Sequence, residues 1–348
     1  MIVFSDLHLK ESSEEICFAV LKWIEEAAKG DVDNGHIIFC GDWWHLRYQV
    51  SVRLLNRVAE LIDRWTNKLR FQVDFVPGNH DQVDVDGHNA LEIFEAFGGV
   101  TVWTEPGIER KGNLGFVPYR KDLEEQRDSL IAVRKELPAK SIVFGHFGVT
   151  GSIMNNGKRA IEGLENLGES FLGGHQINQR IILGHYHRRQ DSKAFEYVGS
   201  PYQTSFGEAG NTCGCLIGKR TDLKFVEIEV GAPKHHILKW DPTRDENPPP
   251  WPGGPHDHVR LDIESGHEAI VSGKFRTVLK KSGLENAQVN VVPVQQPREH
   301  RFQAQQGESL LDSAGRFLRE RLVEEKGDHW DFDQEADELF SELKGWAK

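Results

Sequence analysis

The chain has 348 residues, 38% of them hydrophobic, and a formal net charge of −12 at pH 7. This length is enough for two or three domains, and the acidity argues against nucleic-acid binding through bulk positive charge without excluding a local basic or metal-charged cleft. We expect no signal peptide in the first ten residues and no membrane span, and the four cysteines lack the spacing of a metal finger or a disulfide framework. These features predict a reduced, cytoplasmic protein.

Strand and helix patterns alternate through the first 230 residues. Six apolar runs have the pattern of buried strands: 1–6, 36–42, 73–81, 141–148, 180–187 and 194–201. Helical spacing of apolar residues separates the early runs, at 12–30 and at 51–69. Continuous apolar strands separated by helices predict a largely parallel, covered sheet of α/β type, in which ligands gather at the carboxyl ends of the strands.

The pattern changes near residue 230. We expect residues 231–256, which include a stretch rich in Pro and Gly, to form a linker. Residues 257–296 then show a strand–helix–strand pattern that predicts a small α/β domain. Two amphipathic segments within residues 297–348 predict a C-terminal helical hairpin.

Five polar fragments follow strand-like runs, usually through a glycine. They are Asp6-Leu7-His8, Gly41-Asp42 with His45, Gly78-Asn79-His80-Asp81, Gly145-His146, and Gly184-His185-Tyr186-His187. One such fragment would be an ordinary turn, but five at one sheet edge point to a site. Oxygen and imidazole donors without thiolate suit Mn²⁺, Fe²⁺ or Zn²⁺. Two such ions sharing a carboxylate can activate water and clamp the oxygens of a phosphoester.

In this order the fragments resemble those of the calcineurin-like metallophosphoesterases, over residues 1–230. The resemblance implies a metallophosphoesterase β-sandwich flanked by helices. It implies one ion held by Asp6, His8, Asp42 and His187. A second ion would be held by Asp42, Asn79, His146 and His185, with Asp42 as the bridge. His80 would lie beside the scissile phosphate and protonate the leaving oxygen.

Two segments are similar to those of the SbcD-type DNA double-strand-break repair nucleases: "GDWWH" at 41–45 and "YVGSPYQTSFGEAG" at 197–210. In length the chain is most similar to tailed-phage recombination endonuclease subunits. The resemblance implies a Mn²⁺-dependent 3′→5′ exonuclease and single-strand endonuclease within an SbcCD-like repair or recombination complex, with Mg²⁺, Fe²⁺ or Zn²⁺ as alternative metals. His45 would then support the catalytic histidine, His80.

The same resemblance implies roles for the C-terminal segments. Residues 257–296 would cap bound DNA, residues 297–348 would bind an SbcC-like coiled-coil ATPase, and the chain would form a homodimer. Candidate DNA contacts are Lys158, Arg159, Arg188 and Arg189. The alternative is that each of them is an ordinary solvated charge on the protein surface. We expect Trp43 and Trp44 to pack around the mouth of the site.

Two other functions fit parts of the sequence. A phosphomonoesterase, or a protein or nucleotide phosphatase, would use the same core and metals. A binding subunit that contacts DNA and an ATPase without cleaving would keep its metals for structure alone. The 41–45 and 197–210 segments favour the nuclease over the first, and the complete set of motif residues favours it over the second.

Overall fold

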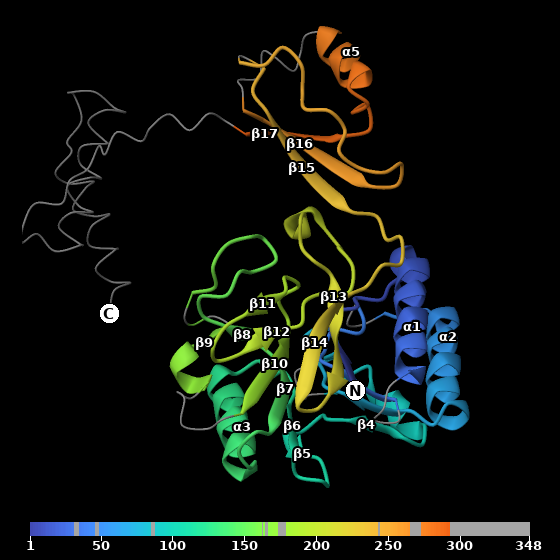
Figure 1. The fold of residues 1–348 in the computed structure, drawn as a ribbon, viewed down its shortest axis with the longest axis vertical. Coiled ribbons are helices and arrows are strands. Elements are labelled where there is room, and N and C mark those ends of the chain that lie inside the picture. Colours follow the sequence, from blue (N-terminus) through green and yellow to red (C-terminus); the bar gives the residue numbers. More distant parts are fainter. Residues whose placement is uncertain are drawn as a thin grey trace, which may run out of the picture. The chain divides into compact units, whose positions relative to one another are not determined.

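The computed structural model describes residues 1–30, 35–45, 49–84, 88–161, 163, 166–172, 179–242, 244–264 and 273–292 (Figure 1). The chain divides after Val292 into two units, and the second, Pro293–Lys348, lies outside the described residues. The C-terminal hairpin therefore stays a prediction. No helix within the described ranges is both long and apolar enough to cross a membrane.

The first of two six-stranded sheets begins at the N-terminus. Its order is β14-β13-β1-β2-β3-β4. The strands are β1 (Ile2–Phe4), β2 (His36–Phe39), β3 (Gln72–Phe75), β4 (Val100–Val102), β13 (Gly214–Lys219) and β14 (Asp222–Glu227). The first four are parallel, whereas β13 and β14 form an antiparallel extension beside β1.

The second six-stranded sheet has the order β11-β12-β10-β7-β6-β5. Its strands are β5 (Gly107–Ile108), β6 (Leu114–Val117), β7 (Ile142–His146), β10 (Arg180–Gly184), β11 (Gln190–Asp191) and β12 (Glu196–Tyr197). The four inner strands are parallel, and the two edge strands are antiparallel to their neighbours. A two-stranded pair, β8 (Gly148–Val149) and β9 (Asn166–Leu167), follows β7 in the chain.

Side chains of each central strand alternate between two cores. In β2, Ile37 and Phe39 join a hydrophobic cluster with helices α1 (Glu14–Lys29) and α2 (Val52–Asp63), which lie side by side in Figure 1. Ile38, between them, joins a second cluster that also contains Phe144 of β7, so this cluster takes side chains from both sheets.

A third cluster covers the other side of the second sheet. It combines residues of β7 and β10 with Leu130 and Val133 of helix α3 (Leu123–Glu136). The result is a mixed α/β structure with several sheets and few helices, which is consistent with the metallophosphoesterase fold that the sequence predicts. The parallel strands bring their carboxyl ends to a common edge.

The later described residues form a separate three-stranded parallel sheet, β15 (His235–Trp240), β16 (His258–Glu264) and β17 (Gln288–Val292), with helix α5 (Gly273–Lys281). Strand β15 lies inside the segment 231–256 that we expected to be a linker. That segment is therefore not wholly a linker: the alternating "HHILKW" pairs with all six residues from His258 to Ile263, and Trp240 and Leu261 enter one core. The domain boundaries remain predictions.

Candidate metal centre

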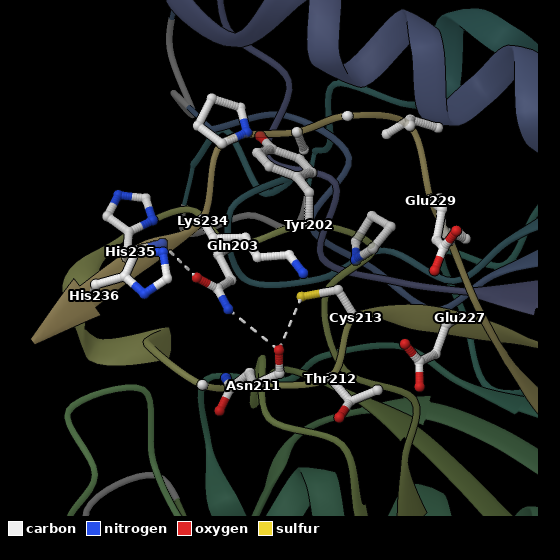
Figure 2. A pocket seen from close by; sticks show the side chains of 17 residues that line it. Tyr202, Gln203, Asn211, Thr212, Cys213, Glu227, Glu229, Lys234, His235 and His236 are labelled. Atoms are coloured by element: carbon white, nitrogen blue, oxygen red, sulfur yellow. Dashed lines mark hydrogen bonds between the residues drawn. The ribbon is translucent and has the colours of Figure 1, made fainter. Parts of the chain in front are cut away.

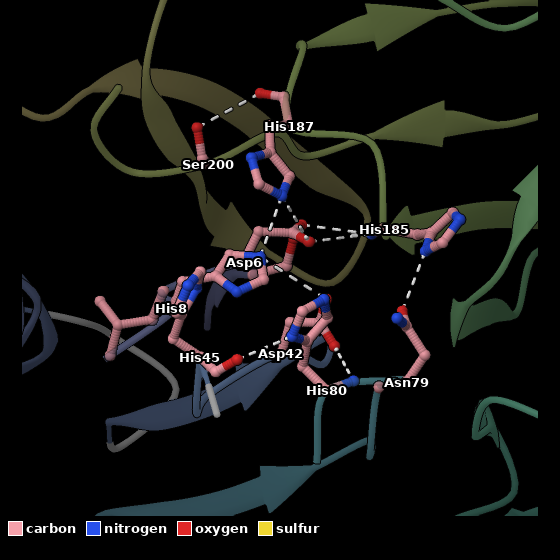
Figure 3. A network of polar contacts seen from close by, with 12 residues as sticks. Asp6, His8, Asp42, His45, Asn79, His80, His185, His187 and Ser200 are labelled. Atoms are coloured by element: carbon pink, nitrogen blue, oxygen red, sulfur yellow. Dashed lines mark hydrogen bonds and ion pairs between the residues drawn. The ribbon is translucent and has the colours of Figure 1, made fainter. Parts of the chain in front are cut away.

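The polar fragments meet at the carboxyl ends of strands from both large sheets (Figure 3). Asp6, Asp42 and Asn79 follow β1, β2 and β3 of the first sheet, whereas His146 ends β7 and His185 follows β10 of the second. A cavity of about 180 Å³ lies at this edge, and its lining residues are His8, Asp42, His45, Asn79, His80, Asn155, His185, His187 and Thr204. Asp6 and His146 lie beside it, within ligand clusters that also contain Asp42 or His8. All nine residues predicted for metal binding or catalysis therefore lie in or beside one site.

Asp6, His8 and His187 form one side of the site. Each offers a ligand atom, and these three atoms lie within 4.8 Å of one another. His8 Nε2 is 3.0 Å from His187 Nε2, which is 3.8 Å from Asp6 Oδ1. All three residues are buried, and their donor atoms point toward the same volume.

Asp42 lies at the centre of the site and contacts both sides of it. Its Oδ2 is 3.6 Å from His8 Nε2, and its Oδ1 is 3.4 Å from His146 Nε2. The backbone N–H of His80 donates to the same Oδ1 at 2.8 Å. This position suits the bridging role that the resemblance implies for Asp42.

Asn79 joins the two histidines of the other side. Its Oδ1 is 3.2 Å from His146 Nε2. The same oxygen is 3.1 Å from His185 Nδ1 (Figure 3). The backbone N–H of His185 lies 3.2 Å from both carboxylate oxygens of Asp6, and it connects the two sides. The structure thus brings together both predicted ligand groups, and the ligand roles themselves stay a proposal.

The backbone is strained where these side chains enter the site. Six non-glycine residues among those described have positive φ, and four of them are predicted ligands: Asp6 (54°), His8 (48°), Asp42 (61°) and His185 (107°). An L-residue in this region costs about 1–3 kcal/mol and persists only where surrounding contacts hold it. Such strain gathers at functional sites.

Two glycines let the chain approach the site closely. A Cβ on Gly41, whose φ is 87°, would lie 2.1 Å from His146 Nδ1. A Cβ on Gly78 would lie 2.3 Å from Asp42 Oδ1. The glycines that precede the polar residues are therefore required for space as well as for the turn.

Asp81 organises the loop that carries Asp42. Its Oδ2 accepts the backbone N–H groups of Asp42 (2.8 Å) and Gly78 (2.9 Å), and its Oδ1 accepts those of Trp43 (3.0 Å) and Trp44 (3.2 Å). The carboxyl is completely buried, and burial together with the charge of Asp42 raises its pKa to about 7. These four contacts show that Asp81 shapes the loop from within the protein.

Burial sets the protonation of the ring nitrogens. It lowers the pKa of His8 well below its usual range and, with the charge of His146, that of His185 to about 3, so both rings are neutral and offer lone pairs. Burial also disfavours charge on His146, but the carboxylates of Asp42 and Asp6 outweigh it and raise the pKa of this ring to about 9. A cation bound between the carboxylates would displace that proton.

The donor set fits divalent metal ions. Asp6 and Asp42 are buried carboxylates, and no lysine or arginine in the described part of the chain forms an ion pair with either. Buried carboxylates without such partners need another positive charge. Oxygen and imidazole donors surround them without a thiolate, a combination that suits Mn²⁺, Fe²⁺ or Zn²⁺.

His80 and His45 are joined through the main chain. Nδ1 of His80 lies 2.9 Å from the backbone carbonyl oxygen of His45, and because a carbonyl only accepts, Nδ1 carries the hydrogen. The rings stack with centroids 5.9 Å apart. Support of His80 by residue 45 thus comes from its carbonyl, while the side chain of His45 lies 3.4 Å from the ammonium of Lys10.

Sequence reasoning did not single out Glu208 as a site residue. Its carboxylate lies 2.8 Å from Nδ1 of His187 and accepts the backbone N–H of Thr204 at 2.9 Å. Burial opposes charge on His187, but Glu208 and Asp6 outweigh it and raise the pKa of this ring. A carboxylate behind a ligating histidine fixes the ring and increases its basicity. A sequence signal for Glu208 existed, because this residue lies in the 197–210 segment that is similar to one in SbcD-type nucleases.

We expect Glu208→Gln to weaken divalent-metal binding by about 10- to 100-fold, because His187 loses the charged partner that orients its ring. Metal titration followed by calorimetry measures the effect, with circular dichroism as the check on folding. Glu227→Gln on β14 is the matched control, since this glutamate is exposed. Equal metal affinity in Glu208→Gln and wild type would contradict a positioning role.

The four candidate DNA contacts differ in how exposed they are and in their partners. Lys158, Arg159 and Arg188 are exposed, although Arg159 donates to the Gly151 carbonyl at 2.9 Å. Arg189 is occupied, because it pairs with Glu196 at 2.7 Å and donates to the Tyr197 carbonyl at 2.8 Å. We therefore retain the first three as candidates and leave out Arg189.

Trp43 and Trp44 do not pack around the mouth of the site, so this expectation was wrong. They are 0% and 1% exposed and belong to the cluster beneath α1 and α2. Trp43 contacts the rings of Phe39 and Phe75 at centroid distances of 5.1 and 5.3 Å. Packing of the two tryptophan rings in the core holds the loop that carries Asp42 in place.

Comparison with known proteins adds one finding. A family model described as calcineurin-like phosphoesterase matches residues 1–189, which is more than half of the chain and includes all the predicted metal ligands. No curated protein matches significantly.

Proposed function

The chain belongs to the calcineurin-like phosphoesterase family, and from this premise we propose that it is a Mn²⁺-dependent DNA nuclease of the SbcD type. Family membership and the buried His/Asp cluster support metal-dependent phosphoester hydrolysis. The narrower proposal is supported chiefly by the contact between Glu208 and His187. That contact brings the 197–210 segment, which is similar to one in SbcD-type nucleases, against the metal site.

The residues of the site divide the work in this proposal. Asp6, His8, Asp42 and His187 would hold one ion, and Asp42, Asn79, His146 and His185 would hold the other. Bound ions would supply a nucleophile at neutral pH and neutralise charge on the phosphate. The Nδ1–H of His80 is hydrogen-bonded to the carbonyl of residue 45, so a His80 ring protonated on both nitrogens would present its Nε2–H to the leaving 3′-oxygen.

Because of the resemblance to SbcD-type nucleases, the proposal also includes an ATPase partner and a dimer. Residues 297–348 would bind an SbcC-like coiled-coil ATPase, and two copies of the chain would form a dimer in a repair or recombination complex. The activities would be 3′→5′ exonuclease and single-strand endonuclease.

The decisive assay uses end-labelled single-stranded and duplex DNA with Mn²⁺, Mg²⁺ or chelator, with and without the ATPase. We expect Mn²⁺-dependent shortening from 3′ ends and internal cuts in single strands, both abolished by chelator. p-Nitrophenyl phosphate serves as the monoester comparison. Rapid monoester hydrolysis without DNA cleavage would instead support a phosphatase, and DNA binding without cleavage under any metal would support the non-cleaving subunit.

A further inference from the structure

A second cavity, of about 220 Å³, adjoins the metal site. It shares His8, His45 and Thr204 with the metal-site cavity. Its remaining lining residues are Lys10, Ser12, Ser13, Ile16, Tyr202, Gln203, Pro233, His235 and His258. The two cavities are therefore neighbours that share part of their walls, and we call the second one the side cavity.

The lining of the side cavity suits an anion. It contains no aspartate or glutamate, and Lys10 provides the one full positive charge among the described residues that line it. Three imidazoles besides His8 and the hydroxyl of Ser12 add hydrogen-bonding groups. The hydroxyls of Ser13, Tyr202 and Thr204 are already engaged within the protein. The ammonium of Lys10 has three N–H donors and contacts Nε2 of His45 at 3.4 Å, so donors remain for a ligand.

Acidic residues border the lining of the side cavity without being part of it. Asp42 of the metal site lies 3.6 Å from His8 Nε2, whereas Glu208 and Asp257 have partners of their own. Glu208 is held by His187 and Thr204. Asp257 lies 3.0 Å from His236 Nε2 and accepts the backbone N–H of Lys234 at 2.8 Å. Their charges are therefore largely offset, and neither residue lines the side cavity.

The small sheet contributes one wall of the side cavity at a defined position. His235 and His258 are register partners on β15 and β16, and their rings lie 4.8 Å apart. The backbone N–H of His235 donates to Gln203 Oε1 at 2.7 Å, and Gln203 Nε2 donates to the Asn211 carbonyl at 3.2 Å (Figure 2). Phe206 packs edge-on against His235 at 4.9 Å. These contacts fix the two histidines beside the segment that carries Glu208.

A neighbouring cavity around Gln203 and His235 does not share this chemistry. It has a volume of about 540 Å³, and Glu227 and Glu229 are among its lining residues (Figure 2). Two carboxylates oppose an anionic ligand. Of these two neighbouring cavities, only the side cavity combines a cation, no acid and walls shared with the metal-site cavity.

We propose that the side cavity binds a phosphate of the nucleic-acid strand next to the phosphate that is cleaved. This inference rests on the proposed function and deepens it, because a site for a second phosphate selects a polynucleotide over a phosphomonoester or a single small diester. Lys10 supplies the charge, and His258 supplies a donor from the small sheet. That sheet then takes part in substrate binding directly.

The first test measures binding of a fluorescein-labelled single-stranded oligonucleotide to the full chain by anisotropy, with chelator present so that no metal chemistry is needed. We expect His258→Asp to weaken binding at least tenfold, because it places a carboxylate against phosphate. Lys10→Gln should weaken it severalfold and reduce the slope of log affinity against log salt by about 0.7, the loss of one phosphate contact on a single strand.

The matched control is His256→Asp, an exposed histidine two residues earlier that lines neither cavity. It adds the same charge outside the side cavity and should bind the oligonucleotide like wild type. Equal weakening in His256→Asp and His258→Asp would mean a general charge effect and would overturn the inference, as would unchanged binding in His258→Asp and Lys10→Gln. Unchanged thermal unfolding confirms that each variant is folded.

A second test compares kcat/KM for the oligonucleotide with that for bis(p-nitrophenyl) phosphate, which has a single phosphodiester, in Mn²⁺. His258→Asp should lower the ratio of the two at least tenfold, mainly through KM for the oligonucleotide. An unchanged ratio would contradict the inference. If wild type cleaves neither substrate, the nuclease proposal fails, and the anisotropy result still decides whether the side cavity binds nucleic acid.

Discussion

Asp42→Ala is expected to lower kcat for phosphodiester hydrolysis by about 10⁴-fold or more, the scale seen when a group acting as a unit with others is removed. Asp42 is the residue whose carboxylate faces both His8 and His146, at 3.6 and 3.4 Å. Its loss therefore affects both predicted ions. Turnover of bis(p-nitrophenyl) phosphate and of labelled DNA in Mn²⁺ measures the effect.

Asp222→Ala is the matched control for this substitution. Asp222 is an aspartate on β14 whose side chain is 66% exposed and pairs only with Lys224 in the described structure, so its loss should leave turnover unchanged. Near-normal turnover in Asp42→Ala would show that the carboxylate bridges no essential ion, and the two-metal assignment would be wrong.

Asp81→Ala is expected to destabilise the protein by about 3–5 kcal/mol, the usual cost of removing one partner from a buried charged network. Four backbone N–H groups, two on each carboxylate oxygen, would lose their acceptor. For a protein of this size the loss corresponds to a fall in Tm of roughly 5 °C. Thermal unfolding followed by circular dichroism, with chelator present, measures stability without a contribution from bound metal.

Asp81→Asn separates the two halves of this network. The amide keeps one oxygen, which can still accept two of the four N–H groups, but its NH₂ faces the other two donors. We expect a smaller fall in Tm than for Asp81→Ala. If Asp81→Ala unfolds at the wild-type temperature, the carboxylate does not hold the loop and some other contact must do so.

The strand ends that form the site were predictable because each follows a simple local rule. An apolar run followed by Gly and a polar residue marks the carboxyl end of a buried parallel strand, and such ends meet at one edge. Asp6, Asp42, Asn79, His146 and His185 were all predicted in this way, and the structure brings them together. What the rule left open was that the strands belong to two sheets.

Helix α3 and strand β15 were not predicted from the sequence, because both depend on contacts between residues that are far apart in the chain. Helix α3 has a weak apolar stripe, and its Arg134 is buried because Nε donates to Gln179 Oε1 at 3.1 Å, 45 residues away. Strand β15 was hidden in a segment rich in Pro and Gly, and it forms by pairing with β16. The apolar stripe of α3 is weak, and the alternation in β15 covers only six residues beside a stretch rich in Pro and Gly, so neither segment was recognised from its own pattern.

The roles of individual side chains were also predicted only where they depend on local sequence. Trp43 and Trp44 were placed at the site mouth because they neighbour Asp42 in sequence, yet the turn directs them into the core. Glu208 was overlooked because it is 21 residues from His187, whose ring it holds. Local sequence therefore predicts which residues reach the site edge, and tertiary packing determines which of them face it.

The left-handed backbone at Asp6, His8, Asp42 and His185 has a consequence for how this sequence can diverge. Glycine would relieve the strain at each position, and asparagine would lessen it. The chemistry of the side chains, and not the backbone conformation, therefore explains why Asp and His occupy these four positions. In a descendant that no longer needs the activity, we expect these positions to drift first toward glycine and asparagine, while the apolar strands beneath them persist. The same change in a relative would then serve as a mark of lost catalysis.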